Sequence, residues 1–178
     1  MKGCMILANG FEDLEATGTI ALLRRGGLEV DLFTIEQENP TGKYGLTLDH
    51  IKPLTSIVPN EYQLVILPGG PGYEALKNNT LVTEVINEFY SDKKYIAAIC
   101  AAPTIFGELG LLRNKTYTCF PGMESSAFEG YHVDDKAVID GTIITGKSAG
   151  AVTDFALAIL TALLGKEAAE SVKQKIYF

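Results

Sequence analysis

The stretch KYIAAICAAPTIFGELG, Lys94 to Gly110, decides the fold class of this chain. Its residues Tyr95 to Ile99 are apolar or small and do not alternate with polar ones, which is typical of a buried strand. Cys100, two alanines and Pro103 follow, and then a segment with a helical pattern. Proline suits the first turn of a helix because the amide that it lacks has no intrahelical partner there. The sequence therefore predicts a strand that passes directly into a helix, with a cysteine at the junction.

The segments on either side of this junction repeat the strand–helix order. Apolar or β-branched runs predict strands at residues 3–8, 28–35, 62–70, 95–99 and 137–145, with a further edge strand at 45–51. Periodic apolar residues predict helices at residues 14–27, 80–94, 150–165 and 166–178 and after Pro103, with Thr80 as an N-cap. Asp140-Gly141 between two β-branched runs predicts a hairpin. This order predicts one α/β domain over residues 1–178, with a mainly parallel sheet covered on both faces.

Composition narrows the classes of function. The 178 residues carry a formal charge of −7 with scattered basic residues, which argues against nucleic acid or an anionic membrane as a partner. The longest apolar stretch is too short to span a bilayer, and the N-terminal residues do not form a signal peptide. Cys4, Cys100 and Cys119 are too widely spaced for a disulfide framework or a zinc cluster. We therefore expect a reduced, cytoplasmic protein.

Cys100 is the first candidate for chemistry. Parallel α/β sheets place their sites at the carboxyl ends of the strands, where this cysteine is expected. The free N–H groups and partial positive charge of a following helix favour thiolate over thiol. A buried, inert cysteine is the alternative. The sequence thus makes Cys100 a candidate nucleophile without deciding its reactivity.

Two further segments are expected at the same sheet edge. In GFEDLEA, the residues Glu12, Asp13 and Glu15 crowd the start of a helix, where capping alone explains carboxylates. Glu15 is also placed to face inward, and a carboxyl group beside a thiolate tends to stay protonated and donate a hydrogen bond to it. The glycines of LPGGPG, including Gly70, can supply N–H groups for an oxyanion hole, although most such segments are plain turns.

Two motifs argue against other chemistries. The residues 141–148, GTIITGKS, match the P-loop pattern, but strand-forming residues fill the space where a phosphate-binding nest would lie. Nucleotide binding is therefore disfavoured. His50 and His132 lack companion ligands at metal-binding spacing, so no metal site is predicted. Whether either histidine meets Cys100 in space as a base stays open.

With these segments in view, the chain resembles the ThiJ/PfpI superfamily, most closely its DJ-1-like branch. The resemblance spans nearly the whole chain and rests on ILANGFEDLEA, LVILPGG, AAICAAP, FALAIL and GKEAA. It implies a flavodoxin-like three-layer sandwich, a cysteine on a strand-to-helix elbow and a homodimer. It also implies that Cys100 is the reactive cysteine, that Glu15 is the protonated carboxyl group beside it, and that Gly70 and Ala101 supply backbone N–H donors.

The chain departs from the superfamily pattern at three positions. Protease-like members have a histidine directly after the cysteine, where this chain has Ala101, so proteolysis is not expected. Phe120 precedes Pro121 where the human-type branch has a histidine, and Tyr44 stands where an arginine-like contact is expected. Cys119 lies beside this position as a candidate secondary thiol, with a plain buried cysteine as the alternative.

The resemblance leaves two functions open. One is a cofactor-independent enzyme of the glyoxalase or deglycase type, in which Cys100 attacks a small electrophilic carbonyl compound such as methylglyoxal. The other is a non-catalytic oxidative-stress sensor or chaperone whose cysteine oxidises to sulfinate. Neither uses a metal or other cofactor. A kinase would need the P-loop match that was discounted above.

Overall fold

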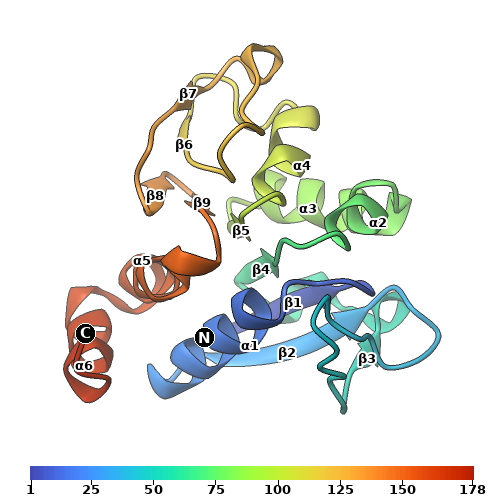
Figure 1. Ribbon diagram of the computed structural model, residues 1–178, viewed down its shortest axis with the longest axis horizontal. Helices are drawn as coiled ribbons and strands as arrows, with labels where there is room; N and C mark the ends of the chain where they lie inside the picture. The colour runs from blue at the N-terminus through green and yellow to red at the C-terminus, as the bar shows by residue number, and fades with distance from the viewer.

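Seven strands form the central sheet of the computed structural model, which describes residues 1–178 (Figure 1). The strand order is β3-β2-β1-β4-β5-β9-β8; β8 pairs antiparallel with β9, and every other pairing in this sheet is parallel. The strands of this sheet are β1 Lys2–Leu7, β2 Glu29–Thr34, β3 Lys52–Pro53, β4 Leu64–Leu67, β5 Tyr95–Ile99, β8 Ala137–Asp140 and β9 Ile143–Gly146. A separate parallel pair consists of β6 Thr116–Tyr117 and β7 Tyr131–His132.

Helices cover both faces of this sheet and make a three-layer sandwich. The helices are α1 Asp13–Arg25, α2 Tyr73–Lys77, α3 Thr80–Ser91, α4 Pro103–Glu108, α5 Val152–Leu164 and α6 Lys166–Lys175. Short 3₁₀ turns lie at Leu54–Ser56, Pro59–Glu61, Ser126–Phe128 and Ala149–Ala151. None of the helices combines the length and the apolar character that crossing a membrane requires.

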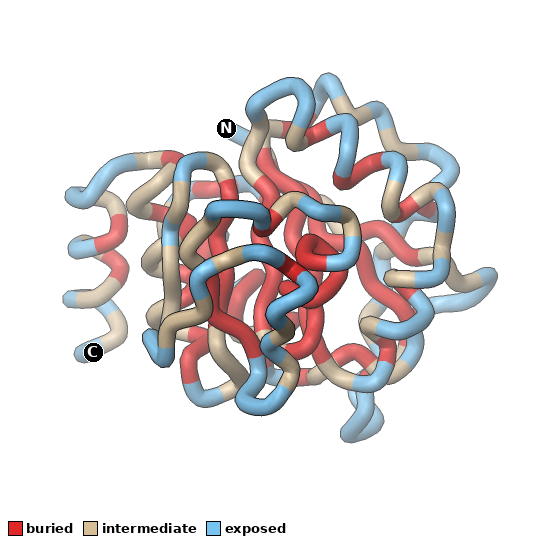
Figure 2. The backbone as a smooth tube through the Cα atoms, turned by 90° about the horizontal axis from the view of Figure 1, so that it is seen from above, coloured by how far each residue is buried: buried red, intermediate tan, exposed pale blue.

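The hydrophobic core is divided by the sheet into two clusters, of 23 and 21 buried residues. Neighbouring residues of one strand enter opposite clusters, since side chains alternate along a strand: Val65 faces the cluster under α2, α3 and α4, and Ile66 faces the cluster under α1, α5 and α6. The buried strands run through the middle of the molecule in Figure 2. Burial on both faces explains why the strand sequences are continuously apolar.

The strand order also fixes where a site can form. Without the edge strands, the strand order is β2-β1-β4-β5-β9, which is the order of flavodoxin-like sheets. In such sheets ligands bind where the order of the strands reverses, at the carboxyl ends of the first and third core strands. In this chain those strands are β1 and β4. The turn after β1 leads to Glu15, the turn after β4 contains Gly69 and Gly70, and β5 ends before Cys100. The three predicted segments therefore meet at one edge of the sheet.

Most of the predicted elements are confirmed, with small differences in their bounds. The hairpin at Asp140-Gly141 forms, with Gly141 at φ 62°, and the middle of the P-loop-like segment, Ile143–Gly146, is its second strand, β9. The edge strand predicted at 45–51 is wrong, because this segment lies in a loop with only a single bridge between Thr41 and Thr47. Asn79, not Thr80, caps α3 by accepting a hydrogen bond from the N–H of Val82.

Candidate active site

The cysteine at the end of β5 occupies a backbone conformation that is rare outside glycine. Cys100 has φ 67°, in the left-handed region, at a cost of about 1–3 kcal/mol. Backbone hydrogen bonds hold the residue there: its N–H donates to the carbonyl oxygen of Gly146 at 2.9 Å, and its carbonyl oxygen accepts from the N–H of Phe120 at 2.7 Å. The neighbouring strand and loop thus force a sharp strand-to-helix turn, as predicted, and the thiol lines a pocket at the sheet edge.

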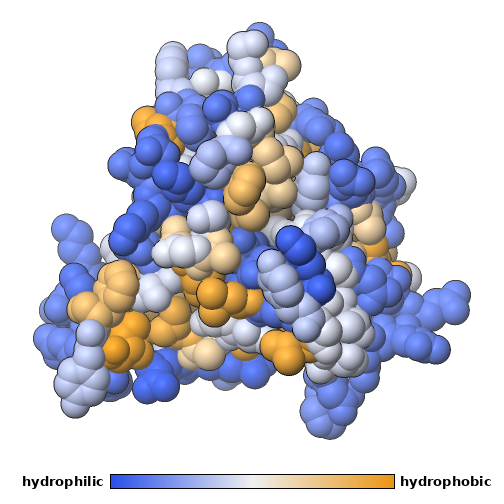
Figure 3. Space-filling model, viewed as in Figure 1, coloured by the Kyte–Doolittle hydropathy of each residue, from blue (hydrophilic) through white to orange (hydrophobic).

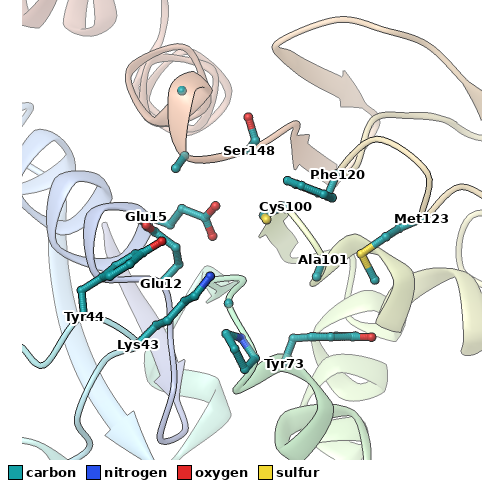
Figure 4. Close-up of a pocket in the computed structure, with 14 residues that line it drawn as sticks. Glu12, Glu15, Lys43, Tyr44, Tyr73, Cys100, Ala101, Phe120, Met123 and Ser148 are labelled. Carbon is teal, nitrogen blue, oxygen red and sulfur yellow. Dashed lines mark hydrogen bonds between the residues drawn. The ribbon is translucent and has the colours of Figure 1, made fainter.

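Glu15 approaches this thiol from the first turn of α1. Its side chain is 1% exposed, and its carboxyl group points toward Cys100 (Figure 4). Oε2 accepts a hydrogen bond of 2.9 Å from the N–H of Gly69, whereas Oε1 is buried without a hydrogen-bond partner. Glu12 caps the helix by accepting from the N–H of Glu15 at 2.6 Å, so the predicted capping role is confirmed for this residue. The inward position of Glu15 is confirmed, although its neighbour Leu14 is exposed.

The glycine turn after β4 closes the site from the third side. A Cβ atom on Gly69 would lie 2.6 Å from Cβ of Cys100 and 2.7 Å from Oε2 of Glu15, so no side chain fits there. Gly70 has φ 81°, a conformation that favours glycine. Its N–H group and that of Ala101 interact with the sulfur of Cys100. The structure therefore brings Cys100, Glu15, Gly70 and Ala101 together at one pocket, where the family resemblance places them.

The pKa values of the two side chains depend on each other. Burial raises the pKa of Glu15 to about 7, although Cys100 and the N–H of Gly69 act to lower it. Burial and the negative charge of Glu15 raise the pKa of Cys100 to about 12, against the opposing effect of the Ala101 and Gly70 N–H groups. The expected low pKa of the thiol is therefore not found while Glu15 is ionised. Because two adjacent buried anions repel each other, the pair retains one proton around neutral pH.

A pocket of about 460 Å³ opens above this pair. Aromatic and aliphatic side chains form much of its wall, and polar groups are few. Its lining consists of Glu12, Glu15, Lys43, Tyr44, Gly70, Pro71, Tyr73, Cys100, Ala101, Phe120, Met123, Ser148, Ala149 and Gly150. A volume of this size suits a small molecule, and the apolar wall reduces the access of water to the reacting groups.

Lys43 is a functional candidate that the sequence analysis missed. Its amino group points into the pocket, and its positive charge acts to lower the pKa of Glu15, against the larger effect of burial (Figure 4). The loop that carries it is held by Asp13, whose carboxylate accepts the N–H groups of Tyr44 and Leu46 at 2.8 and 3.0 Å. Only this non-periodic loop places the lysine, so no pattern along the chain indicates its role.

Other residues singled out in the sequence lie elsewhere. Cys119 is 1% exposed and is not part of the pocket wall; burial, followed by the charge of Glu124, raises its pKa to about 11. His50 is exposed on a loop and His132 packs against Tyr117, so neither lines the pocket. The site therefore has no imidazole base, and Glu15 is the buried carboxyl group next to the thiol.

Comparisons with known proteins identify the family and support the fold of this chain. A family model described as DJ-1/PfpI family matches residues 1–162. Protein DJ-1 homolog B of Arabidopsis thaliana is 36% identical over 93% of this chain, which spans only 39% of that relative. A protein named deglycase from Pyrococcus horikoshii is 29% identical over 83% of this chain and 90% of its own length. The crystal structure of Drosophila melanogaster DJ-1beta superposes with a TM-score of 0.91 and is 32% identical, covering 99% of this chain and 97% of that one.

Proposed function

Because the chain belongs to the DJ-1/PfpI family, we propose that its pocket is the active site of a cofactor-independent enzyme that acts on small α-oxoaldehydes such as methylglyoxal. One observation carries the proposal: a buried carboxyl group, Glu15, faces a thiol on a strained elbow, Cys100, and the pair retains a proton. A nucleophile and a proton donor are then in contact before any substrate arrives.

The reaction begins with the proton on Glu15 and the negative charge on Cys100. The thiolate attacks the aldehyde carbon, a C–S bond forms, and the carbonyl π electrons move to oxygen. The N–H groups of Gly70 and Ala101 stabilise the developing oxyanion, which takes the proton of Glu15. This step leaves Glu15 as a carboxylate beside a neutral hemithioacetal, and the pKa of this carboxyl group near 7 suits it to act as a base.

Glu15 then transfers a proton between adjacent carbons. The carboxylate removes the hydrogen of the former aldehyde carbon as a proton, which gives an enediolate. The hydroxyl proton on this carbon then moves to the neighbouring oxygen, and Glu15 returns its proton to the neighbouring carbon. The product is a thioester of Cys100, which water cleaves to a hydroxy acid and the thiolate. The sum is addition of one water molecule to methylglyoxal to give lactate and one proton, without an external oxidant or reductant.

Lys43 contributes a positive charge to this site. Its amino group opposes the negative charge that the enediolate and the ionised hydroxy acid product carry, and it shares the pocket with Glu15 (Figure 4). Deglycase activity on glycated thiols and amines begins in the same way, because the thiolate again attacks a carbon that derives from a carbonyl group. The name of the Pyrococcus horikoshii relative supports this extension.

A second function is an oxidative-stress sensor or chaperone without turnover. It is favoured by the absence of an imidazole from the pocket wall. In this case two molecules of hydrogen peroxide each transfer one oxygen atom to the thiolate of Cys100, releasing water and leaving a sulfinate. A protonated Glu15 and the N–H groups of Gly70 and Ala101 are positioned to hydrogen-bond to its oxygens.

The proposed assembly is a homodimer in the reducing cytoplasm, with no nucleic acid or membrane as a partner. Apolar side chains gather on the face over α1 and α5, which gives a second copy of the chain a surface to cover (Figure 3). The net charge of −7 disfavours polyanionic partners. A reducing compartment keeps Cys100 available as a nucleophile.

Anaerobic turnover of methylglyoxal by reduced protein tests the proposal. We expect lactate from the parent, and a loss of at least about 100-fold in kcat/KM in both Cys100→Ser and Glu15→Gln. Cys4→Ala, which removes a buried thiol that does not line the pocket, is the control for general loss of a cysteine. No lactate from protein whose Cys100 still reacts rapidly with iodoacetamide would reject the enzyme and favour the sensor.

A further inference from the structure

Three side chains with metal-ligating atoms meet outside the pocket. The Sγ of Cys119, a carboxylate oxygen of Glu124 and an imidazole nitrogen of His132 all lie within 4.8 Å of one another. None of these residues lines the catalytic pocket, and the reaction described above uses none of them. The three residues lie too far apart along the chain to form a recognisable spacing. Folding therefore creates a ligand set that the sequence analysis did not predict.

The backbone under this cluster is fixed by pairing and by hydrogen bonds. Tyr117 of β6 pairs with His132 of β7, and the two rings pack with their centroids 5.5 Å apart. The N–H of Thr118 donates to the hydroxyl of Thr145 at 2.9 Å, which ties the start of the Cys119 loop to the central sheet. These contacts hold the Cys119 and His132 backbones in place without any ligand, so little order has to be gained on binding.

Glu124 completes the cluster from the loop between β6 and β7. Its Oε2 accepts a hydrogen bond of 2.8 Å from the N–H of Gly122, which leaves Oε1 free of that contact. Glu124 is exposed and its side chain can rotate, whereas Cys119 is buried. The cluster therefore combines a fixed thiol with an adjustable carboxylate at the edge of solvent, from which an ion can enter.

We propose that Cys119, Glu124 and His132 bind a Zn²⁺ ion, with water as the fourth ligand. A thiolate, an imidazole and a carboxylate together favour this borderline-soft cation over Mg²⁺ or Ca²⁺, which prefer oxygen ligands. Zinc bonds of about 2.0–2.3 Å place neighbouring ligand atoms roughly 3.5 Å apart in a tetrahedral site. The three ligand atoms, which lie within 4.8 Å of one another, therefore need only a small approach to reach this spacing. On binding, the S–H proton of Cys119 passes to solvent and an S–Zn bond forms, with no change in oxidation state.

The bound ion would act on the catalytic pocket through one short loop. Phe120 and Met123, which lie between Cys119 and Glu124 in the chain, form part of the pocket wall. The N–H of Phe120 also donates to the carbonyl oxygen of Cys100 at 2.7 Å. An ion held by Cys119 and Glu124 would fix both ends of this segment. The site is therefore a structural zinc site that stiffens one wall of the pocket.

Titration of the reduced chain with Co²⁺ under anaerobic conditions tests this proposal. Cobalt replaces zinc in such sites, and a cysteine ligand gives a thiolate-to-cobalt charge-transfer band in the near ultraviolet. We expect one equivalent of Co²⁺ to produce this band, and Zn²⁺ to abolish it by displacement. The band should disappear in Cys119→Ser, and the affinity for Co²⁺ should fall by at least about 10-fold in His132→Gln and in Glu124→Gln.

Two variants serve as matched controls. His50→Gln removes the other histidine of the chain, which is exposed on a distant loop, and Cys100→Ser removes the thiol of the catalytic pocket. Both should leave the band and the affinity unchanged. The proposal is wrong if no stoichiometric band forms, if the band is lost in Cys100→Ser but kept in Cys119→Ser, or if His132→Gln and Glu124→Gln both bind as tightly as the parent. Far-ultraviolet circular dichroism identifies a variant that has lost its fold, and the other two ligand variants then decide the result.

Discussion

The backbone N–H of Gly69 donates a hydrogen bond of 2.9 Å to Oε2 of Glu15, while the other carboxyl oxygen of Glu15 is buried without a partner. The two oxygens of one carboxyl group are thus in different environments. The first is held by the glycine turn after β4, and the carboxyl group as a whole faces the thiol of Cys100 (Figure 4). This asymmetry favours a proton on Oε1, from which it can be donated to sulfur.

Burial of Glu15 should make the stability of the protein depend on pH. Its pKa is raised from 4.5 to about 7 in the folded state, so the protonated carboxyl group stabilises the fold below the unfolded pKa. That contribution is lost as the pH rises through about 7, where the Cys100–Glu15 pair releases its first proton, which the account assigns to the thiol of Cys100. Relative to Glu15→Gln, the parent should lose about 3 kcal/mol of unfolding free energy between about pH 4 and about pH 8. Urea denaturation of both proteins at each pH measures this difference, and a parallel pair of curves would contradict it.

Gly69→Ala should remove activity because the new methyl group has no space. It would lie 2.6 Å from Cβ of Cys100 and 2.7 Å from Oε2 of Glu15, so the two reacting side chains must separate. We expect a loss of about 1–3 kcal/mol in stability and at least about 100-fold in kcat/KM. Gly27→Ala is the control, since Gly27 has φ 86° and no atom within 4 Å of its Cβ position. This control should lose stability but keep kcat/KM, and equal activity in the two variants would contradict the account.

Lys43→Met should shift the pH dependence of turnover. The lysine acts to lower the pKa of Glu15, against the larger effect of burial, so its removal raises that pKa further. The Cys100–Glu15 pair then loses its first proton at higher pH, and the rising limb of kcat/KM moves in the same direction. Lys43→Arg keeps the charge and should keep the parent profile. Profiles measured with methylglyoxal decide this, and an unchanged limb in Lys43→Met would exclude an electrostatic role.

Asp13→Ala should release the loop that carries Lys43 and Tyr44. Asp13 is 5% exposed and accepts the N–H groups of Tyr44 and Leu46, which lose their partners in the variant. We expect faster hydrogen exchange at these two amides, about 1–3 kcal/mol lower stability and a raised KM with a smaller change in kcat. Asp49→Ala, at an exposed position further along the loop, should leave both amides protected. Protection that survives in Asp13→Ala would show that other contacts hold the loop.

The sequence predicts most of this fold because its strongest signals are local. Continuous apolar runs identify the central strands, and the position of Cys100 between a strand and Pro103 identifies the elbow. The segment 45–51 shows why such patterns fail at the edge of a sheet. This segment has strand-forming residues. However, Asp13, which is far away in the chain, accepts hydrogen bonds from the N–H of Tyr44, just before the segment, and from the N–H of Leu46, near its start. A tertiary contact overrides the local preference there.

The candidate site likewise contains residues that the sequence predicts and one that it does not. Glu15, Gly70 and Cys100 can be predicted, because each follows a strand whose carboxyl end lies at the same edge of a parallel sheet. Lys43 cannot, because its position depends on a loop without periodicity. The mutual dependence of the Cys100 and Glu15 pKa values also cannot be predicted, since it follows from how deeply both groups are buried. The low thiol pKa is expected from the helix N-terminus alone, and this expectation does not include the effect of burial.

The central claim is that Cys100 carries the charge while Glu15 carries the proton. The charge on Cys100 is measured by a pH titration of thiolate ultraviolet absorbance, taken as the difference between the parent and Cys100→Ser. The proton on Glu15 is measured by the infrared carbonyl band of its carboxylic acid, taken as the difference between the parent and Glu15→Gln. The account predicts that the thiolate appears near neutral pH while the carboxylic acid band persists. Loss of the acid band near pH 7, with thiolate appearing only near the pKa of about 12 that burial and an ionised Glu15 together impose, would contradict it.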